Sequence, residues 1–507
     1  MEETFVGQGL HDVAGLTEFR LGQSFQSKEE AVLSVKDYSI RRGVEADASI
    51  TIKVLQEATE STYGFRLSYR KVWMAKQKAV AQIYGDWEVS YGELPRWILG
   101  VRSTMDGTIA LLKTSPVRVG DQVDESTVYF HRLFWTFPPC IEAFRHCKPL
   151  VSIDGTHLYG KYGGTLLLVI AQDGNSNILL IAFALVEEEN TESWSYFLTN
   201  LRRHVTPQMG ILVIFYKHDD IKAALETPDS GWQPLHAFKG QDARRWLVNA
   251  AYAKTEAEFE YWFDIMRTKN SAMCDWANRM EYERWTQHKD GGRRYGHMTT
   301  NISKCVNSVL KGTKNLPVMS LVKSTYLRLA ELFVVRGQSE EAQLGGRHRF
   351  SQALVKAIEQ NLKDSRCFTV TLFDKHKSEY TIAETTPTGK FSLGTYRVSL
   401  RDRTCDCGNF QALHYPYCHA IACCDQSRLD WVTFVDEVYS MAEVFKVYQM
   451  AFAPCIPKGL WPPYDGPTVI PDPNMRRARE SQPRSTQIHN NMEEGDPNRP
   501  KRCGLCR

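Results

Sequence analysis

The chain has 507 residues, enough for about two to four domains of ordinary size. It is 43% hydrophobic, 24% charged and 11% aromatic, a globular composition that excludes a wholly disordered or collagen-like chain. No run of about eighteen apolar residues occurs, so no membrane span is expected, and the first residues lack the pattern of a secretory signal. The 13 cysteines are therefore expected to be reduced thiols, some of them metal ligands.

Positive charge is concentrated in a few segments. The net charge is only +3, yet Arg284–Arg336 contains ten basic residues against two acidic ones, and Asn474–Arg507 contains eight against four. Such clusters favour a surface for a polyanion such as DNA. A solvated basic face without a partner is the alternative.

Helical patterns dominate the N-terminal part. One helix is expected over Ser27–Arg42, and two more over Ile50–Tyr63 and Ser68–Tyr84, each closed by a glycine. The last two can be interpreted as a helix-turn-helix, or as a helical hairpin without a DNA-binding role. In the first case the basic residues placed near phosphates are Arg70, Lys71, Lys76 and Lys78.

Residues 149–225 have the clearest pattern. Leu150–Asp154 is a short apolar run, and Thr165–Ala171 and Ile178–Val186 flank an Asp-Gly turn typical of a hairpin. A helix capped by Asn190 or Thr191, the apolar strand Ile211–Phe215 and a helix from Asp219 follow. This order, β-β-β-α-β-α, predicts an α/β fold with an RNase H-like core.

The remainder alternates in character. Residues 245–336 have helical patterns, including Leu316–Arg336, and residues 366–400 return to short strands. From about residue 454, Pro, Gly, Asn and Arg dominate and predict a mostly disordered tail.

An RNase H-like core processes phosphodiesters with two divalent ions held by clustered carboxylates. Asp154, at the end of the first strand, stands where the first ligand is expected, and the second is expected near Phe215–His218. The alternative interpretation of Asp154 is a turn-capping residue beside Gly155.

Several blocks resemble one family, the plant Mutator-like (MuDR-type) transposases. They are Ser152-Ile-Asp-Gly-Thr-His-Leu-Tyr-Gly-Lys-Tyr162, Asn190-Thr-Glu-Ser-Trp-Ser-Tyr-Phe197, Asn249-Ala-Ala-Tyr-Ala-Lys-Thr255 and Arg293-Arg-Tyr-Gly-His-Met-Thr-Thr-Asn301. The resemblance implies a nuclear, DNA-binding protein that contacts DNA with residues such as Arg293 and Arg294 as well. It divides the chain into an N-terminal remnant (1–46), a helical linker (47–145), the RNase H-like transposase domain (146–245), a helical part (246–345), a strand-containing region (346–432) and a mostly disordered basic tail (433–507).

The family's acidic triad is incomplete in this sequence. Asp154 matches the first position, but the second aligns with Tyr216 and the third with Lys304. A phenol binds Mg²⁺ poorly and an ammonium repels it, so the chain is expected to bind DNA without cutting it. The alternative is an active DDE transposase using Mg²⁺ and recruiting other carboxylates such as Asp219, Glu281 or Glu283.

The strongest metal signal lies between residues 404 and 422. Cys405 and Cys407, followed by Cys418 and His419, provide soft ligands for tetrahedral Zn²⁺. The block resembles a SWIM-type zinc finger, whose third ligand would align with Tyr417 and not with Cys418. Adjacent helical residues diverge by about 100°, so His414 and Cys423 are reserve candidates for a ligand.

Two further expectations concern the C-terminal part. Cys503-Gly-Leu-Cys506 resembles half a zinc knuckle and is not expected to bind zinc tightly alone, and Cys423 and Cys424 are otherwise expected to be core residues. The alternative to a DNA-binding role is that the SWIM-type finger contacts protein partners. The chain would then be a protein-interaction module or a transcription regulator.

Overall fold

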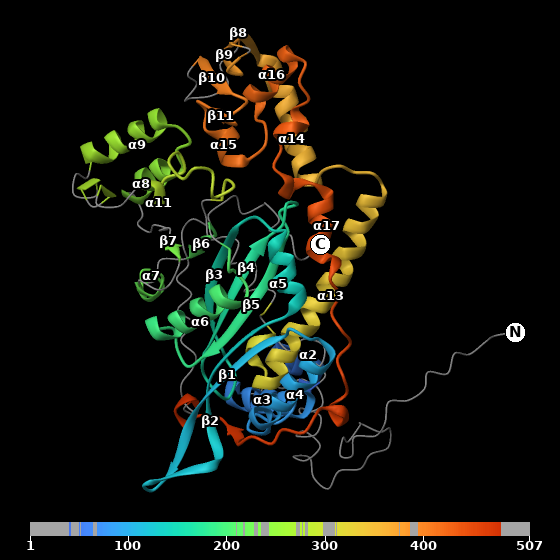
Figure 1. The fold of residues 1–507 in the computed structure, drawn as a ribbon. Coiled ribbons are helices and arrows are strands. Elements are labelled where there is room, and N and C mark those ends of the chain that lie inside the picture. The colour runs from blue at the N-terminus through green and yellow to red at the C-terminus, as the bar shows by residue number, and fades with distance from the viewer. Residues whose placement is uncertain are drawn as a thin grey trace, which may run out of the picture.

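The computed structural model describes residues 40–41, 50, 52–63, 68–208, 210–215, 219–227, 232–234, 243–269, 274–275, 277–278, 282–297, 310, 312–374, 376–385 and 394–477. Within them the chain is a mixed α/β protein with two sheets (Figure 1). The helix expected over Ser27–Arg42 and the half knuckle at Cys503–Cys506 lie outside the described residues, apart from a helical Ile40–Arg41. None of the described helices is long and apolar enough to cross a membrane.

The large sheet contains both parallel and antiparallel pairs. Its strand order is β1-β2-β5-β4-β3-β6-β7, with β12 paired to β2. The strands are β1 (Ile109–Val119), β2 (Gln122–Thr136), β3 (Leu150–His157), β4 (Thr165–Gln172), β5 (Ile178–Val186), β6 (Leu212–Phe215), β7 (Gln233–Pro234) and β12 (Thr468–Ile470).

The centre of this sheet confirms the order predicted for residues 149–225. β3, β4 and β5 form an antiparallel meander, α6 (Thr191–His204) follows, β6 pairs parallel with β3, and α7 (Asp219–Leu225) comes next. All eight residues of β4 are buried. Such continuous apolar strands are expected where helices cover both faces of a sheet, and α5 (Pro138–Arg145) and α6 both pack on β5.

The hairpin of β1 and β2 was not predicted, because the region 47–145 was interpreted as wholly helical. The hairpin extends the sheet beyond β5 through antiparallel pairs such as Phe134 with Ala184, and Figure 1 shows it projecting from the body. The helical part of the region consists of α2 (Ile52–Tyr63), α3 (Tyr69–Tyr84) and α4 (Val89–Thr104). The first two are the helices expected there.

Helices from the middle of the chain complete the body. α13 (Val318–Gly345) begins two residues after the predicted start at Leu316 and continues nine residues beyond the predicted end at Arg336. It packs on α4 and on α17 (Met441–Gln449). A separate apolar cluster is formed by α8 (Ala243–Tyr252), α9 (Glu256–Lys269) and α11 (Tyr282–Trp285).

The second sheet belongs to a smaller unit, at the top of Figure 1. Its order is β11-β10-β9-β8, from β8 (Phe368–Asp374), β9 (Glu379–Glu384), β10 (Thr395–Ser399) and β11 (Thr404–Cys405). Three helices accompany it: α14 (Gln352–Asp364), α15 (Asn409–Leu413) and α16 (Cys418–Ser427). Cys423 and Cys424 are buried in its apolar core, as expected for core residues.

The segment 433–477 is folded, contrary to the disordered tail expected there. It contains α17, β12 and short 3-10 turns, and Trp461 and Val469 are buried in the main core. Its Pro- and Gly-rich composition gives it little order of its own, so its order comes from packing on α4 and β2.

Candidate functional site

The edge of the large sheet at Asp154 is one candidate region. β3, β5 and β6 run in the same direction, so their carboxyl ends meet at the same edge. Asp154 is half-buried near the end of β3, and its Oδ1 accepts a hydrogen bond from the Gly155 amide at 3.0 Å. Asp154 and Gly155 both pair with β4 and belong to the strand, so Asp154 does not cap a turn here.

Charges of both signs surround Asp154. A Cβ atom at Gly155 would lie 2.8 Å from a carboxylate oxygen of Glu189, so that carboxylate lies against the backbone beside Asp154. The buried Lys314 lies near the end of β3, because its carbonyl accepts the Tyr159 amide at 2.9 Å. Burial lowers the pKa of Lys314 to about 8, and the charge of Asp154 opposes this shift.

The other two triad positions, Tyr216 and Lys304, lie outside the described residues, and so does Glu281. Asp219 and Glu283 are exposed, the first at the start of α7 and the second on α11. Within the described ranges a single group of His, Cys, Asp or Glu side chains brings three or more ligand atoms close enough to share an ion, and Asp154 is not in it.

That group consists of Cys405, Cys407 and His419, which could hold a metal ion. β11 ends at Cys405, a tight turn carries Cys407, and α16 places His419, so all three ligand atoms lie within 4.8 Å of one another. The Sγ of Cys405 is 3.3 Å from Nδ1 of His419. All three side chains are buried, which suits a structural metal centre.

Neighbouring side chains orient these ligands. Three aromatic rings surround the imidazole of His419: Tyr396 stacks on it at 4.1 Å, and Phe368 and Tyr417 approach edge-on. The amide of Gln411 accepts from the Cys405 backbone N–H and donates to its carbonyl, both at 3.0 Å. Contacts of this kind, outside the ligands themselves, fix ligand geometry at metal centres.

The pKa values of the two thiols are shifted in opposite directions, that of Cys405 upwards and that of Cys407 downwards. A hydrogen bond from Cys405 lowers the pKa of the Cys407 thiol well below its usual value, and His419 acts in the same direction. The Asn409 amide lies 3.7 Å from the sulfur as a further donor. A lower pKa favours the thiolate, which is the form of cysteine that binds metals.

The structure does not bring the other predicted ligands into this group. Cys418 begins α16 next to His419, where helical side chains diverge by about 100°, and burial raises the pKa of its thiol to about 12. His414 points elsewhere: its Nε2 lies 2.8 Å from the Gly292 carbonyl, and its ring stacks on Tyr295 at 4.1 Å. Cys423 is packed in the apolar core of the unit.

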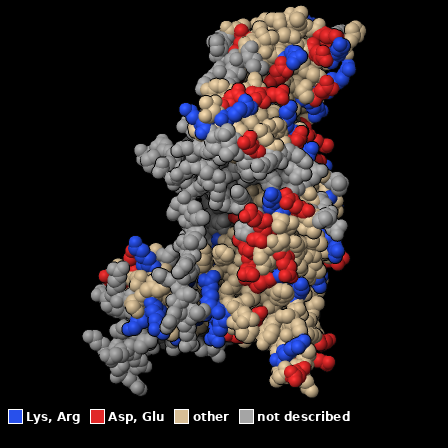
Figure 2. Space-filling model, turned by 90° about the vertical axis from the view of Figure 1, so that its left-hand side faces the viewer, with Lys and Arg blue, Asp and Glu red and all other residues tan. Residues whose placement is uncertain are grey.

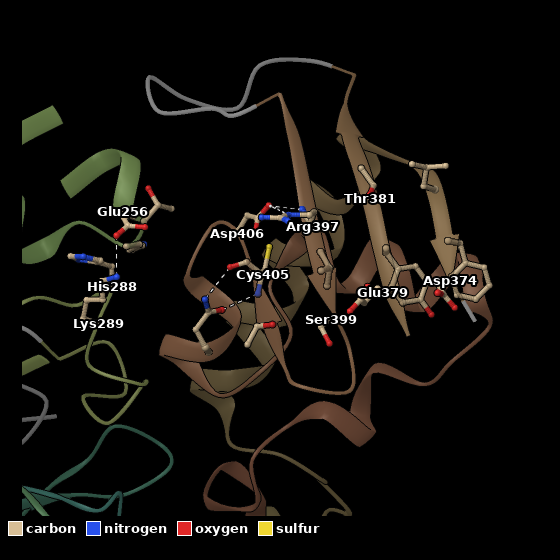
Figure 3. A pocket seen from close by; sticks show the side chains of 18 residues that line it. Glu256, His288, Lys289, Asp374, Glu379, Thr381, Arg397, Ser399, Cys405 and Asp406 are labelled. Atoms are coloured by element: carbon tan, nitrogen blue, oxygen red, sulfur yellow. Dashed lines mark hydrogen bonds and ion pairs between the residues drawn. The ribbon is translucent and has the colours of Figure 1, made fainter. Parts of the chain in front are cut away.

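A cavity of about 680 Å³ adjoins the Cys405 side of the group (Figure 3). It lies between the β8–β11 sheet and the start of α9, and the ion pairs Glu256–Lys289 and Arg397–Asp406 belong to its lining. Gly408, with φ of +73°, brings the metal-site turn against the Lys254 carbonyl, where a Cβ atom would lie 2.0 Å away. Sequence reasoning missed this junction, although a glycine after Cys-x-Cys was its visible signal.

The proposed DNA-contacting residues divide into exposed and buried ones. Those that are exposed are Arg70, Lys71, Lys78 and Arg293. Lys76 is buried, and its Nζ donates to the Ile50 carbonyl at 2.6 Å. This hydrogen bond connects α3 to the residues at the start of α2. Arg294 is also buried, 3.3 Å from the Asp290 carboxylate. These two side chains are therefore used in contacts within the chain, and they do not offer exposed charges to DNA as the other four do.

Part of the chain is similar to a known protein family. No curated protein matches the chain. Residues 150–238 match the MULE transposase domain family, and they form β3 to β7 with α6 and α7 between them. This match supports a Mutator-like transposase as the origin of the central part of the large sheet.

Proposed function

We propose that this chain is a transposase-derived, zinc-binding and DNA-binding nuclear protein that no longer cuts DNA. The observation that carries the proposal is the pairing of a MULE transposase match at residues 150–238 with Tyr216 and Lys304 at the positions that align with the second and third acidic residues. The first points to handling of DNA, and the second argues against two-metal catalysis.

The strand arrangement supports an RNase H-like core. Three antiparallel strands are followed by a helix and a strand that returns parallel to the first, giving the order β5-β4-β3-β6 in the middle of the sheet. In this arrangement the end of β3 and the end of β6 are neighbours. Two of the three carboxylates of an active site would come from those ends.

The chemistry around Asp154 supports loss of cleavage. Two-metal catalysis needs several carboxylates to hold the ions that stabilise the attacking and leaving oxygens. The aligned positions carry Tyr216 and Lys304, and the charge of Asp154 acts on the buried Lys314. A cation beside the one remaining carboxylate disfavours a divalent ion there.

The donor set near the C-terminal end fits Zn²⁺. Two thiols and an imidazole are soft or borderline ligands of the kind that selects zinc over magnesium. The ion would be held by Cys405, Cys407 and His419. It would connect the turn after β11 to α16, as in a SWIM-type finger. Structural zinc sites have four ligands, and the group formed by described residues supplies three of them.

The exposed cations support a DNA surface. Arg70, Lys71 and Lys78 project from α3, and Arg293 belongs to the segment with the largest excess of basic residues. Phosphate contacts by such residues release counterions, so affinity for duplex DNA is expected to fall steeply with salt.

The test is a salt titration of duplex binding together with a nicking assay. Replacing Arg70, Lys71 and Lys78 with Ala is expected to reduce the slope of log K against log salt by about 2–3, since each phosphate contact contributes about 0.9. Replacing the exposed Lys113, Arg118 and Lys356 is the matched control and is expected to leave the slope unchanged. Binding that does not respond to salt contradicts the DNA proposal, and Mg²⁺-dependent nicking abolished by Asp154→Asn contradicts the loss of cleavage.

A further inference from the structure

The cavity beside the metal group lies between two parts of the chain that are distant in sequence. Its floor is one face of the β8–β11 sheet, and the opposite wall consists of residues 254–256, at the start of α9, together with His288 and Lys289. Figure 3 shows Glu256 and His288 on one side of the cavity and Asp374 on the other. The volume of about 680 Å³ is within the range of about 300–1,000 Å³ that is usual for ligand pockets.

The strand register identifies the side chains that share the floor. Residues directly opposite each other on antiparallel strands lie on the same face, so Leu372, Thr381 and Arg397 form one row across β8, β9 and β10. A second row, two residues further along these strands and continued by β11, contains Asp374, Glu379, Ser399 and Thr404. All of these residues line the cavity. Tyr380 and Val398, which alternate with them, are buried in the core of the unit on the other face.

Two ion pairs compensate only part of the charge in the cavity. Lys289 Nζ lies 3.0 Å from the Glu256 carboxylate, and Arg397 Nε lies 3.3 Å from the Asp406 carboxylate. Three further charged side chains of the lining form no ion pair with another described residue: Lys254, Asp374 and Glu379. The cavity therefore keeps one uncompensated cation near the metal-site turn, where the Lys254 carbonyl meets Gly408, and two carboxylates at the end of β8.

The two carboxylates at the end of β8 repel each other. Asp374 and Glu379 are directly opposite across β8 and β9, a position where like charges destabilise a sheet. The backbone N–H groups of Lys377 and His376 donate to Asp374 Oδ1 at 3.2 and 2.9 Å and lower the pKa of its carboxyl, so it is ionised at neutral pH. The side chains of His376 and Lys377 do not line the cavity. A cationic group of a ligand entering there would relieve the repulsion.

An apolar side chain lies beside these carboxylates. Leu372 is two residues before Asp374, on the same face of β8, and it is 68% exposed. An extended segment of a ligand also places every second side chain on one face. A cationic and an apolar side chain that are two residues apart in such a segment therefore match Asp374 and Leu372.

The lining does not suit a nucleic acid. Burial lowers the pKa of His288 to about 4, so this side chain is neutral at pH 7. Neither row of the floor contains an aromatic side chain on which a base could stack, and Figure 2 shows side chains of both signs intermixed around the small unit at the top. The cavity is lined by three cations, Lys254, Lys289 and Arg397, and by four carboxylates, Glu256, Asp374, Glu379 and Asp406.

We propose that this cavity binds an extended segment of a partner protein in which a lysine or arginine is two residues from an apolar residue. The cationic side chain lies between Asp374 and Glu379, the apolar one covers Leu372, and Lys254 pairs with an acidic or carbonyl group of the segment at the other end. The inference does not rest on DNA binding or on the loss of cleavage, because its grounds are the shape of the cavity and the charge of its lining.

A peptide selection tests the chemistry of the partner. Random heptapeptides displayed on phage are selected on the full chain at about 0.1 M salt, where the screening length is about 10 Å. Peptides with Lys or Arg two positions from Leu, Ile, Val or Phe are expected to be enriched about fivefold or more over the unselected library, because complementary charge gives specificity. Selection of acidic peptides, or no enrichment of this pattern, overturns the proposal.

Variants of the full chain locate the binding site. Asp374→Asn together with Glu379→Gln is expected to weaken binding of a selected, fluorescently labelled peptide about fivefold to tenfold in an anisotropy titration, since two exposed ion pairs are lost. The matched control removes two exposed acids of the same unit outside the cavity, Glu359→Gln with Asp425→Asn, and is expected to bind the peptide as the wild-type chain does. Equal affinities of the two variants overturn the proposal.

Changing the peptide gives the same test without altering the fold. Replacing its Lys or Arg by Gln is expected to weaken binding to the wild-type chain by a similar factor and to have no further effect on the Asp374→Asn, Glu379→Gln variant. An equal loss in both chains would place the cationic side chain elsewhere and overturn the proposal. Replacing Arg70, Lys71 and Lys78 by Ala is expected to leave peptide binding unchanged, so this proposal and the DNA proposal fail separately. Displacement of the peptide by duplex DNA from that triple variant would also overturn it.

Discussion

The two regions that carry candidate metal ligands differ in how their ligands are assembled. Cys405, Cys407 and His419 lie within fifteen residues of one another, on a turn and a helix of one small unit. The acidic triad of the large sheet would draw on positions 154, 216 and 304, which are spread over three separate segments. A site of the first kind depends on one local turn, whereas a site of the second kind fails when any of three distant positions changes.

The two regions also differ in local charge. The thiols are buried together with an oriented imidazole and have no cationic side chain among the three ligands. Asp154 instead acts on the buried ammonium of Lys314 and has Glu189 close to its neighbour Gly155. The first region thus presents three metal ligands with no cation among them, whereas the charge of Asp154 raises the pKa of the buried Lys314 against the effect of burial. Metal should be required for folding in the first region and dispensable in the second.

The largest effect is expected from removing a zinc ligand. Cys405→Ser or His419→Ala is expected to weaken zinc affinity about a thousandfold or more and to unfold the β8–β11 unit, because zinc binding is folding free energy in small metal domains. Zinc content of the purified chain and chelator competition measure this. Cys367→Ser, at a half-buried cysteine of the same unit, is the control and is expected to retain zinc. Unchanged zinc content in Cys405→Ser would remove the proposed centre.

The junction beside the metal-site turn gives the second effect. Gly408→Ala is expected to destabilise the chain by about 3–4 kcal/mol, because a side chain there must adopt a positive φ and also meet the Lys254 carbonyl at 2.0 Å.

Gly210→Ala separates these two causes. Gly210 has a φ of +81° but nothing within 4 Å of a Cβ atom, so about 1 kcal/mol is expected from the backbone alone. Urea unfolding compares the variants. Equal losses would mean that the turn is not held against α9 as the structure has it.

The features that could be predicted from the sequence are those with local causes. The strands from Leu150 to Phe215 are continuous apolar runs, and the Cys-x-Cys turn and His419 lie close together in sequence. The β1–β2 hairpin was missed because Lys113, Pro116 and Arg118 interrupt the apolar pattern of β1. Its place in the sheet depends on the pairing of β2 with β5, which is a long-range contact.

Long-range packing explains the other failures. The order of residues 454–477 depends on docking to β2 and α4, which no local pattern encodes. The failure of Cys418 to join the metal group depends on where α16 begins, and the burial of Lys76 depends on the carbonyl of Ile50.

The smallest effect concerns Asp154. If the edge were a bare carboxylate cluster awaiting Mg²⁺, Asp154→Asn would relieve repulsion and stabilise the fold. Because the charge of Asp154 acts on the buried Lys314, the change is expected instead to destabilise the fold by about 1–2 kcal/mol. Urea unfolding in the absence of metal measures the difference, and Asp219→Asn, at an exposed position of the same edge, is expected to change stability by less than about 0.5 kcal/mol.

A double-mutant cycle identifies the partner. Lys314→Met removes the buried charge, so Asp154→Asn is expected to cost nothing further in that background, giving a coupling energy of about 1–2 kcal/mol. Zero coupling, or stabilisation by Asp154→Asn in the wild-type background, would show that the lysine does not take the place of a metal ion. The two regions would then differ only in how many metal ligands they bring together, because no protein cation would act on the ligands of either region.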